Sequence, residues 1–194
     1  MSWPTKRSLL VPLALALAAA CAPIVEVETE PIAQTIPVTS VGLQAYVELA
    51  IDMPPQSQGD VRVEDVFANL QVHNASRASN MLIEMRVSVQ GTAAPGTPFA
   101  FTQANRPSYF PTSVAVLGPK TYAAGTTTPE HIAGAPLIPI IGEPRIWLIV
   151  SNTVTSVGLG DVLPLQADLN QIVLHAVVTK SLAGVGGGLE ATGM

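Results

Sequence analysis

Residues 61–90 read VRVEDVFANLQVHNASRASNMLIEMRVSVQ, and this stretch decides the fold class. Apolar and polar side chains alternate with a period of two on both sides of a polar segment that opens at Asn74. The apolar sets are Val66, Ala68, Leu70 and Val72 before the turn, and Met81, Ile83, Met85, Val87 and Val89 after it. A period of two indicates half-buried strands. Two such strands joined by a short polar loop predict an antiparallel hairpin. Glu84 and Arg86 are expected on its solvent face, where a cross-strand charge pair would contribute a few tenths of a kcal/mol at most.

Three further stretches carry strand patterns, at residues 41–53, 145–152 and 169–179. The middle one is almost wholly apolar, which indicates a central strand buried on both faces. No stretch has the pattern of a long amphipathic helix. The strand, the turn at Asn74 and the following strand resemble immunoglobulin and fibronectin type domains. We therefore predict an all-β fold, a single antiparallel β-sandwich of immunoglobulin-like type over residues 41–180.

Residues 91–144 hold nine prolines and six glycines, which exclude long regular elements. Short strands are expected at 98–102 and 112–117. Five aromatic residues fall in this region: Phe99, Phe101, Tyr109, Phe110 and Tyr122. We expect them to cap the open end of the sandwich core; the alternative is that they line a recognition surface.

The first twenty residues have the layout of a secretory signal peptide. Lys6 and Arg7 are followed by an apolar run over 9–20 that ends in three alanines, where a signal peptidase needs small side chains. The run is too short to cross a bilayer, which needs roughly 20 apolar residues. We expect residues 1–20 to be cleaved.

Cys21 is the single cysteine and directly follows the alanine run. With Ala19 and Ala20 it resembles the lipobox of bacterial lipoproteins. That resemblance implies a diacylglycerol group on the Cys21 sulfur and cleavage before Cys21, and Ala22 implies sorting to the outer membrane. The family prefers Leu where this chain has Ala18, and the alanines also fit ordinary cleavage, so a secreted protein with a free thiol stays open.

The flanks of the predicted sandwich have distinct compositions. Residues 21–40 are rich in proline and glutamate, which favours an extended, lipid-anchored linker. Residues 181–194 are rich in glycine and are expected to form a flexible tail.

Charge and residue spacing argue against several functions. Removal of residues 1–20 leaves seven basic and fourteen acidic residues, a balance that disfavours nucleic acid as a partner. His73, His131 and His175 are too far apart for a familiar metal motif. Glu130 and His131 are adjacent, and adjacent side chains of an extended chain point apart. The sequence predicts no catalytic residue, no metal and no cofactor.

The best binding candidate is the segment 105–110, NRPSYF, with Arg106, Tyr109 and Phe110. An arginine beside two aromatic residues is typical of interfaces; the alternative is a loop whose rings cover the core. We predict a lipid-anchored, non-catalytic structural or interaction module of the bacterial cell envelope, with an envelope protein as partner. One alternative is a binding protein for a small apolar or glycan ligand that uses residues 99–122; another is a metal-dependent enzyme.

Overall fold

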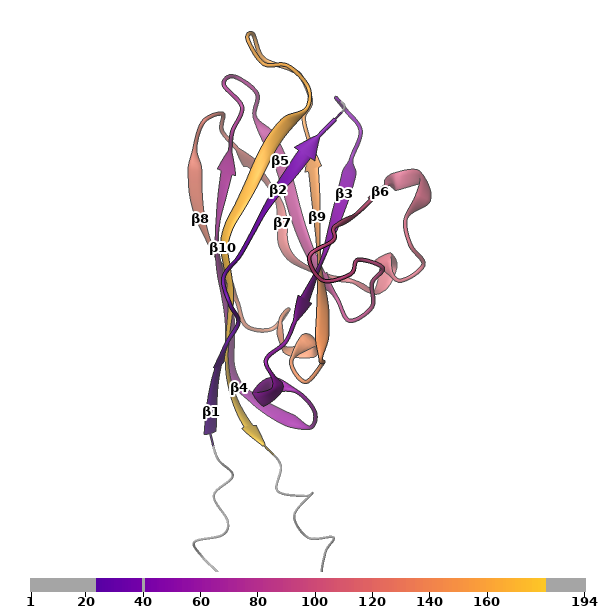
Figure 1. Ribbon diagram of the computed structural model, residues 1–194. Coiled ribbons are helices and arrows are strands. Elements are labelled where there is room, and N and C mark those ends of the chain that lie inside the picture. Colours follow the sequence, from indigo (N-terminus) through magenta and orange to yellow (C-terminus); the bar gives the residue numbers. More distant parts are fainter. Residues whose placement is uncertain (1–23, 40, 181–194) are drawn as a thin grey trace, which may run out of the picture.

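Two antiparallel sheets pack face to face in this computed structural model, which describes residues 24–39 and 41–180 (Figure 1). The predicted signal peptide, Cys21 and the predicted tail lie outside the described residues. The first sheet contains β1 (Ile24–Glu28), β2 (Ile32–Val38), β4 (Val61–Asn74), β8 (Thr127–Ala133) and β10 (Leu165–Lys180). The second sheet contains β3 (Ala45–Asp52), β5 (Met81–Ser88), β6 (Phe99–Thr102), β7 (Val114–Tyr122) and β9 (Arg145–Thr153). Short 3₁₀ turns lie at Pro55–Ser57 (η1), Gln103–Asn105 (η2), Phe110–Thr112 (η3) and Ile138–Ile140 (η4). The predicted all-β antiparallel sandwich is confirmed.

The strand order is that of a jelly roll. Strand β2 pairs with β10, β3 with β9, β4 with β8 and β5 with β7, all antiparallel. The pairs β10–β4 and β9–β5 then join these into two sheets. Successive strands from β2 to β5, and again from β7 to β10, therefore lie in opposite sheets, as in a double Greek key. An immunoglobulin domain instead keeps several successive strands in one sheet, so the immunoglobulin-like part of the prediction is corrected.

The predicted hairpin over residues 61–90 is wrong for the same reason. Strands β4 and β5 lie in different sheets, and their apolar faces pack against each other across the core. Asn74 is fully buried at the connection, where its Nδ2 donates to the carbonyls of Ser79 and Tyr122 at 2.9 and 3.0 Å. The Asp161 carboxylate accepts hydrogen bonds from the amides of Arg77 and Ala78 at 2.7 and 3.0 Å. These bonds hold the chain as an arch between the sheets.

Residues 24–38 are part of the sandwich and not a linker. Strands β1 and β2 both pair with β10, from Ile24 opposite Thr179 to Val38 opposite Leu165. Val27, Ile36 and Val38 are buried in the main core. The extended conformation was foreseen from the prolines, but the period-two apolar face gives these residues a sheet to join. Pro37 is tolerated because β2 is an edge strand, where one side needs no N–H donor.

The other strand predictions agree with the structure. Strand β9 lies between β3 and β5, and both its inward and its outward side chains are buried, as expected for a central strand. Strands β3, β6, β7 and β10 cover the predicted segments with shifted ends. Strand β8 was not predicted, because Pro129 and its threonines resemble a loop in sequence.

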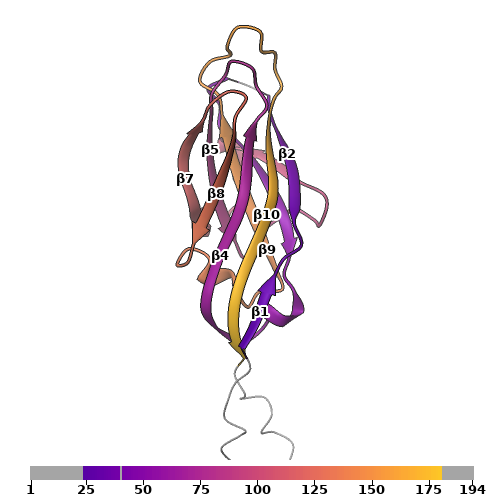
Figure 2. The same ribbon diagram turned by 90° about the vertical axis from the view of Figure 1, so that its left-hand side faces the viewer.

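The chain enters and leaves the sandwich at one pole. Ile24 lies opposite Thr179 in the register, and the start of β1 and the end of β10 lie side by side in both views (Figures 1 and 2). The loop after β9 lies at the other pole (Figure 1). Over 24–39 and 41–180, no helix has the length and hydropathy needed to cross a bilayer.

Candidate functional site

A second, smaller apolar core lies on the outer face of the second sheet. We call it the outer cluster: Tyr46, Phe101, Phe110 and Ile149 are buried there, with Phe99 and Tyr109 partly buried against them. Tyr46 stacks on Phe101 with centroids 5.0 Å apart, and Phe110 meets Tyr46 edge-on at 5.0 Å. The segment between β5 and β7 folds back to form this cover. Four of the five aromatic residues thus cover a sheet face and do not cap the end of the sandwich, which corrects the prediction; Tyr122 lies in the main core.

Glu48 holds this covering segment in place. It is fully buried on the outward side of β3, and its Oε1 accepts the backbone amides of Thr92 and Ala93 at 2.6 and 2.7 Å. Its Oε2 accepts the Tyr109 hydroxyl at 2.5 Å. Burial, together with the bond to Glu48, raises the pKa of Tyr109 to about 12. Tyr109 therefore stays protonated, and its hydroxyl is engaged by Glu48 within the fold. We assign it a structural contact in place of the predicted binding role.

Trp147 supports the same segment from β9. Its Nε1 donates to the carbonyl of Ala93 at 3.0 Å. A Cβ added at Gly91 would lie 2.2 Å from the Trp147 ring, so only glycine lets the backbone pass this close. The contact fixes the start of the covering segment against the sheet.

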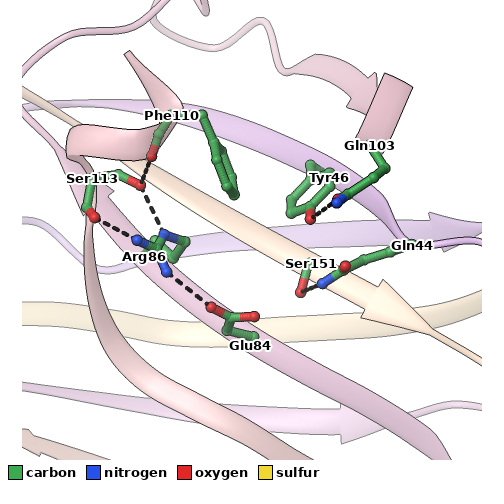
Figure 3. A network of polar contacts seen from close by, with 8 residues as sticks. All are labelled: Gln44, Tyr46, Glu84, Arg86, Gln103, Phe110, Ser113 and Ser151. Atoms are coloured by element: carbon green, nitrogen blue, oxygen red, sulfur yellow. Dashed lines mark hydrogen bonds and ion pairs between the residues drawn. The ribbon is translucent and has the colours of Figure 1, made fainter. Parts of the chain in front are cut away.

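Arg86 ties the other end of the segment to β5. Its Nε donates to Ser113 Oγ at 2.8 Å, its Nη2 to the Ser113 carbonyl and its Nη1 to Glu84 at 3.1 Å (Figure 3). The charge pair therefore runs along a single strand, which corrects the predicted cross-strand pairing. Both side chains lie on the outer face as expected, but the segment covers most of their surface. The guanidinium also lies 5.3 Å from the centroid of the Phe110 ring.

Arg106 is the predicted binding residue that stays open to solvent. Its guanidinium lies 5.0 Å from the centroid of the buried Phe110 ring, and it forms no ion pair with any described residue. Burial raises the pKa of Tyr46, and the nearby Arg106 charge partly opposes that rise. An open groove of about 560 Å³ runs past Arg106, which we call the Arg106 groove. Its lining is Gln103, Ala104, Arg106, Pro107, Ser108, Phe110 and Pro111.

The three histidines lie on the outer face of the first sheet. Phe67 lies between two of them, stacked on His175 with centroids 4.6 Å apart and tilted against His131 at 5.4 Å. His131 Nδ1 is 2.8 Å from Asn69 Oδ1, and His73 Nδ1 is 3.0 Å from Thr127 Oγ1. Within the described ranges, no three His, Cys, Asp or Glu side chains converge to hold a metal ion.

Glu130 and His131 point to opposite faces of β8, as predicted. Glu130 turns inward, where Lys120 Nζ and the Tyr122 hydroxyl both donate to its Oε1, at 2.6 and 3.0 Å. Burial and the Glu130 contact raise the pKa of Tyr122. The three side chains link the two sheets at their β7–β8 edge and leave the carboxylate of Glu130 to a structural role.

Exposed apolar side chains gather at the pole opposite the chain ends. Leu159 is 100% exposed and Val162 79% exposed in the loop after β9. Leu43 is 67% exposed before β3, and this segment meets the start of the loop where the Gly42 amide donates to the Val154 carbonyl. Asp161 holds the base of the loop through its bonds to the arch. The sequence patterns did not single out these residues.

Comparisons with known proteins find distant similarities of fold. No known protein family and no curated protein matches the sequence. A chain from the structure of the infectious bursal disease virus Gx strain is 12% identical over 86% of this chain and 33% of that chain, with a TM-score of 0.39. A chain of Desmodium yellow mottle tymovirus is 11% identical over 93% of this chain and 99% of that chain, with a TM-score of 0.33. The protein spans about a third of the length of the first of these, and neither similarity carries an argument about its function.

Proposed function

We propose that this protein is a lipid-anchored component of the bacterial cell envelope, at the outer membrane, whose jelly-roll body is a non-catalytic interaction module. The observation that carries the proposal is the position of the first and last described strands. Strand β1 begins three residues after Cys21 and pairs with the end of β10. Three residues reach at most about 10 Å, so a lipid on Cys21 would hold this pole of the body close to the bilayer without a stalk.

The opposite pole suits a partner. Exposed apolar surface gathered in one place marks interaction sites. The loop after β9, which carries the exposed Leu159 and Val162, lies at the pole that a tether on Cys21 would direct away from the bilayer (Figure 1). The base of this loop is held by hydrogen bonds, so the side chains are presented on a fixed support. An envelope protein with an apolar recess is the partner that this pole fits.

Three hydrogen-bonded carboxylates support a non-catalytic role. Glu48, Glu130 and Asp161 each accept hydrogen bonds that hold a segment or join the sheets. A carboxylate committed in this way is not free to move a proton to a substrate. The polar groups at these positions are explained by the fold itself.

Membrane fractionation with the variant Cys21→Ser tests the anchor. The wild-type protein should stay with the membrane after a high-salt wash, and the variant should move to the soluble fraction. Mass spectrometry of the wild-type amino terminus should show acyl chains on Cys21. The variant Ala18→Leu, which restores the residue that lipoproteins prefer, is the matched control and should remain at the membrane. A membrane-bound Cys21→Ser protein, or an unmodified thiol in the wild type, would refute the anchor.

The partner requires a separate experiment. Cross-linking in intact cells should give a defined adduct that is lost in a Leu159→Ser, Val162→Ser double variant and kept in Ile138→Ser, whose side chain is 48% exposed in η4, before the start of β9 and away from the loop that follows β9. An adduct of equal yield in all three proteins would exclude the apolar pole as the docking surface.

The second candidate is a binding protein for a small ligand that uses residues 99–122. The Arg106 groove favours it, because the groove is open and lies beside a rigid aromatic support. The aromatic rings argue against a purely apolar ligand, since Phe101 and Phe110 are buried and already packed on one another. Arg106 is the exposed predicted binding residue of this region, and its charge favours a polar ligand.

A further inference from the structure

We propose that the Arg106 groove binds an oxyanion, a carboxylate or phosphate group carried on a small polar molecule. The inference rests on the second candidate function, that of a ligand-binding protein, and names its ligand class. It is carried by three features of the groove: the placement of Arg106, the chemistry of the other lining residues, and the state of the nearby acidic side chains.

Arg106 is placed before any ligand arrives. The guanidinium lies over the ring of Phe110, which is itself locked by Tyr46 and Phe101. The guanidinium lies close enough to the Tyr46 hydroxyl to oppose the rise of its pKa. Contact with an aromatic face leaves the other N–H groups, which lie in the guanidinium plane, free for a ligand. A planar set of N–H donors matches the two oxygens of a carboxylate or phosphate. Because the support is rigid, little side-chain entropy remains to be lost on binding.

The groove offers hydrogen-bond donors and contains no carboxylate. Ser108 lines it with a hydroxyl, and the Gln103 side chain accepts the Tyr46 hydroxyl at 2.8 Å through Oε1, which leaves its Nε2 as a donor. Three other open grooves on the described surface differ in this respect. Each of these three is lined by at least one glutamate: Glu26 and Glu28, Glu28 and Glu30, or Glu130. In a chain with twice as many acidic as basic residues after position 20, an acid-free groove with a lone arginine is selective for anions.

The acidic residues Glu84 and Glu48 bond other partners and do not line the groove. Glu84 bonds Arg86, and Glu48 lies buried beneath Thr92, Ala93 and Tyr109. Arg106 forms no ion pair with any described residue, so its positive charge is not offset by a carboxylate partner. The local field therefore favours an anion even though the whole protein is acidic.

The lining of the groove suits a compact ligand. The groove is open, with a volume of about 560 Å³, so a bound molecule would contact it on one side. Pro107 and Pro111 give it flat apolar walls that suit the body of a sugar or a similar compact molecule. An acidic sugar and a phosphate present the same oxyanion chemistry, and the experiment separates them.

Titration calorimetry on the full chain carrying Cys21→Ser tests the inference at constant ionic strength. D-glucuronate, inorganic phosphate and D-glucose are the probes. Saturable binding of glucuronate or phosphate, with no heat from glucose, is expected. Arg106→Gln should weaken this binding at least tenfold, and Arg106→Lys severalfold, because a lysine keeps the charge but not the paired donors. Arg77→Gln is the matched control and should bind like the parent, since Arg77 is exposed at the far pole.

The outcomes are distinct. Binding of glucuronate alone assigns a carboxylate, and binding of phosphate alone assigns a phosphate; either supports the inference when Arg106→Gln removes it. No saturable binding of either anion, or equal binding by Arg106→Gln, overturns it. Circular dichroism spectra and melting temperatures of the variants show whether each remains folded. Membrane fractionation is read separately, so a failed anchor and a failed anion site cannot be confused.

Discussion

Glu48 should be the most sensitive polar position of the second sheet. It is fully buried and accepts three hydrogen bonds, two from the backbone amides of Thr92 and Ala93 and one from Tyr109. In Glu48→Ala these donors lose their acceptor. Hydrogen bonds to charged groups contribute about 1.5–3 kcal/mol each, and a buried donor left unsatisfied costs about 1–3 kcal/mol. Thr92 is exposed and water can reach its amide, so we expect a total of about 3–5 kcal/mol, below the sum of the three.

Urea and thermal unfolding measure this loss. A change of that size should lower the melting temperature by about 10 °C, since 1 kcal/mol shifts a domain of this length by about 2–4 °C. Glu48→Gln should cost less, about 1–2 kcal/mol, because the amide oxygen can still accept the two backbone amides. Glu26→Ala is the control. Glu26 is exposed, so its removal should change the free energy of unfolding by less than about 0.5 kcal/mol.

A fluorescence measurement separates a local effect from a general one. Trp147 is the single tryptophan after residue 20, and it contacts the segment that Glu48 holds. Release of that segment should shift Trp147 emission to longer wavelength at temperatures where the main core is intact. If the free energy of unfolding of Glu48→Ala lies within 0.5 kcal/mol of that of the wild type and its Trp147 emission is unchanged, the outer cluster does not depend on this carboxylate.

Three further predictions concern the covering segment and strand β2. Gly91→Ala should cost about 1–3 kcal/mol in urea unfolding, because its Cβ would overlap Trp147, whereas Gly118→Ala, which faces open space, should be nearly neutral. The raised pKa of Tyr109 stabilises the fold fully below the pKa of an unfolded tyrosine, about 10, and this contribution is lost as pH rises toward about 12. Tyr109→Phe should therefore reduce the fall in the free energy of unfolding between these two pH values, measured by urea unfolding at each pH. An unchanged pH dependence in the variant would contradict the assignment. Ile36→Ala should cost about 2–4 kcal/mol by the same assay if residues 24–38 belong to the sandwich, and nothing if they form a linker.

Sequence periodicity predicts strands well here but says little about which strands pair. Alternation over residues 61–90 identifies which side chains face the core. It is the same for a hairpin within one sheet and for an arch between two, because both bury the same face. The deciding feature is the side chain of Asn74, which bonds the carbonyl of Tyr122, 48 residues away. No local pattern contains that contact.

The sequence predicts the part of the candidate site that is local in the chain and misses the part that depends on distant contacts. Arg106, Tyr109 and Phe110 stand close together in sequence, and composition alone marked them. Tyr46 and Glu48 fall on the polar phase of the alternation in β3, which indicates a solvent-facing side. They are buried only because a segment more than forty residues further along the chain folds over them. A second core on the outer side of a sheet therefore produces no recognisable pattern of apolar residues in the sequence of the strand that it covers.

The second core also explains why the flank of this body, and not just its pole, can be functional. A sheet face open to water offers mobile side chains, whereas here packed rings and a buried carboxylate fix the position of Arg106. The covering turns η2 and η3 project from the side of the sandwich, away from both poles (Figure 1). A tether at the pole of the chain ends would therefore leave the Arg106 groove and the apolar pole accessible at the same time. Ligand binding and partner docking would then be independent, so Arg106→Gln should leave cross-linking at the apolar pole unchanged.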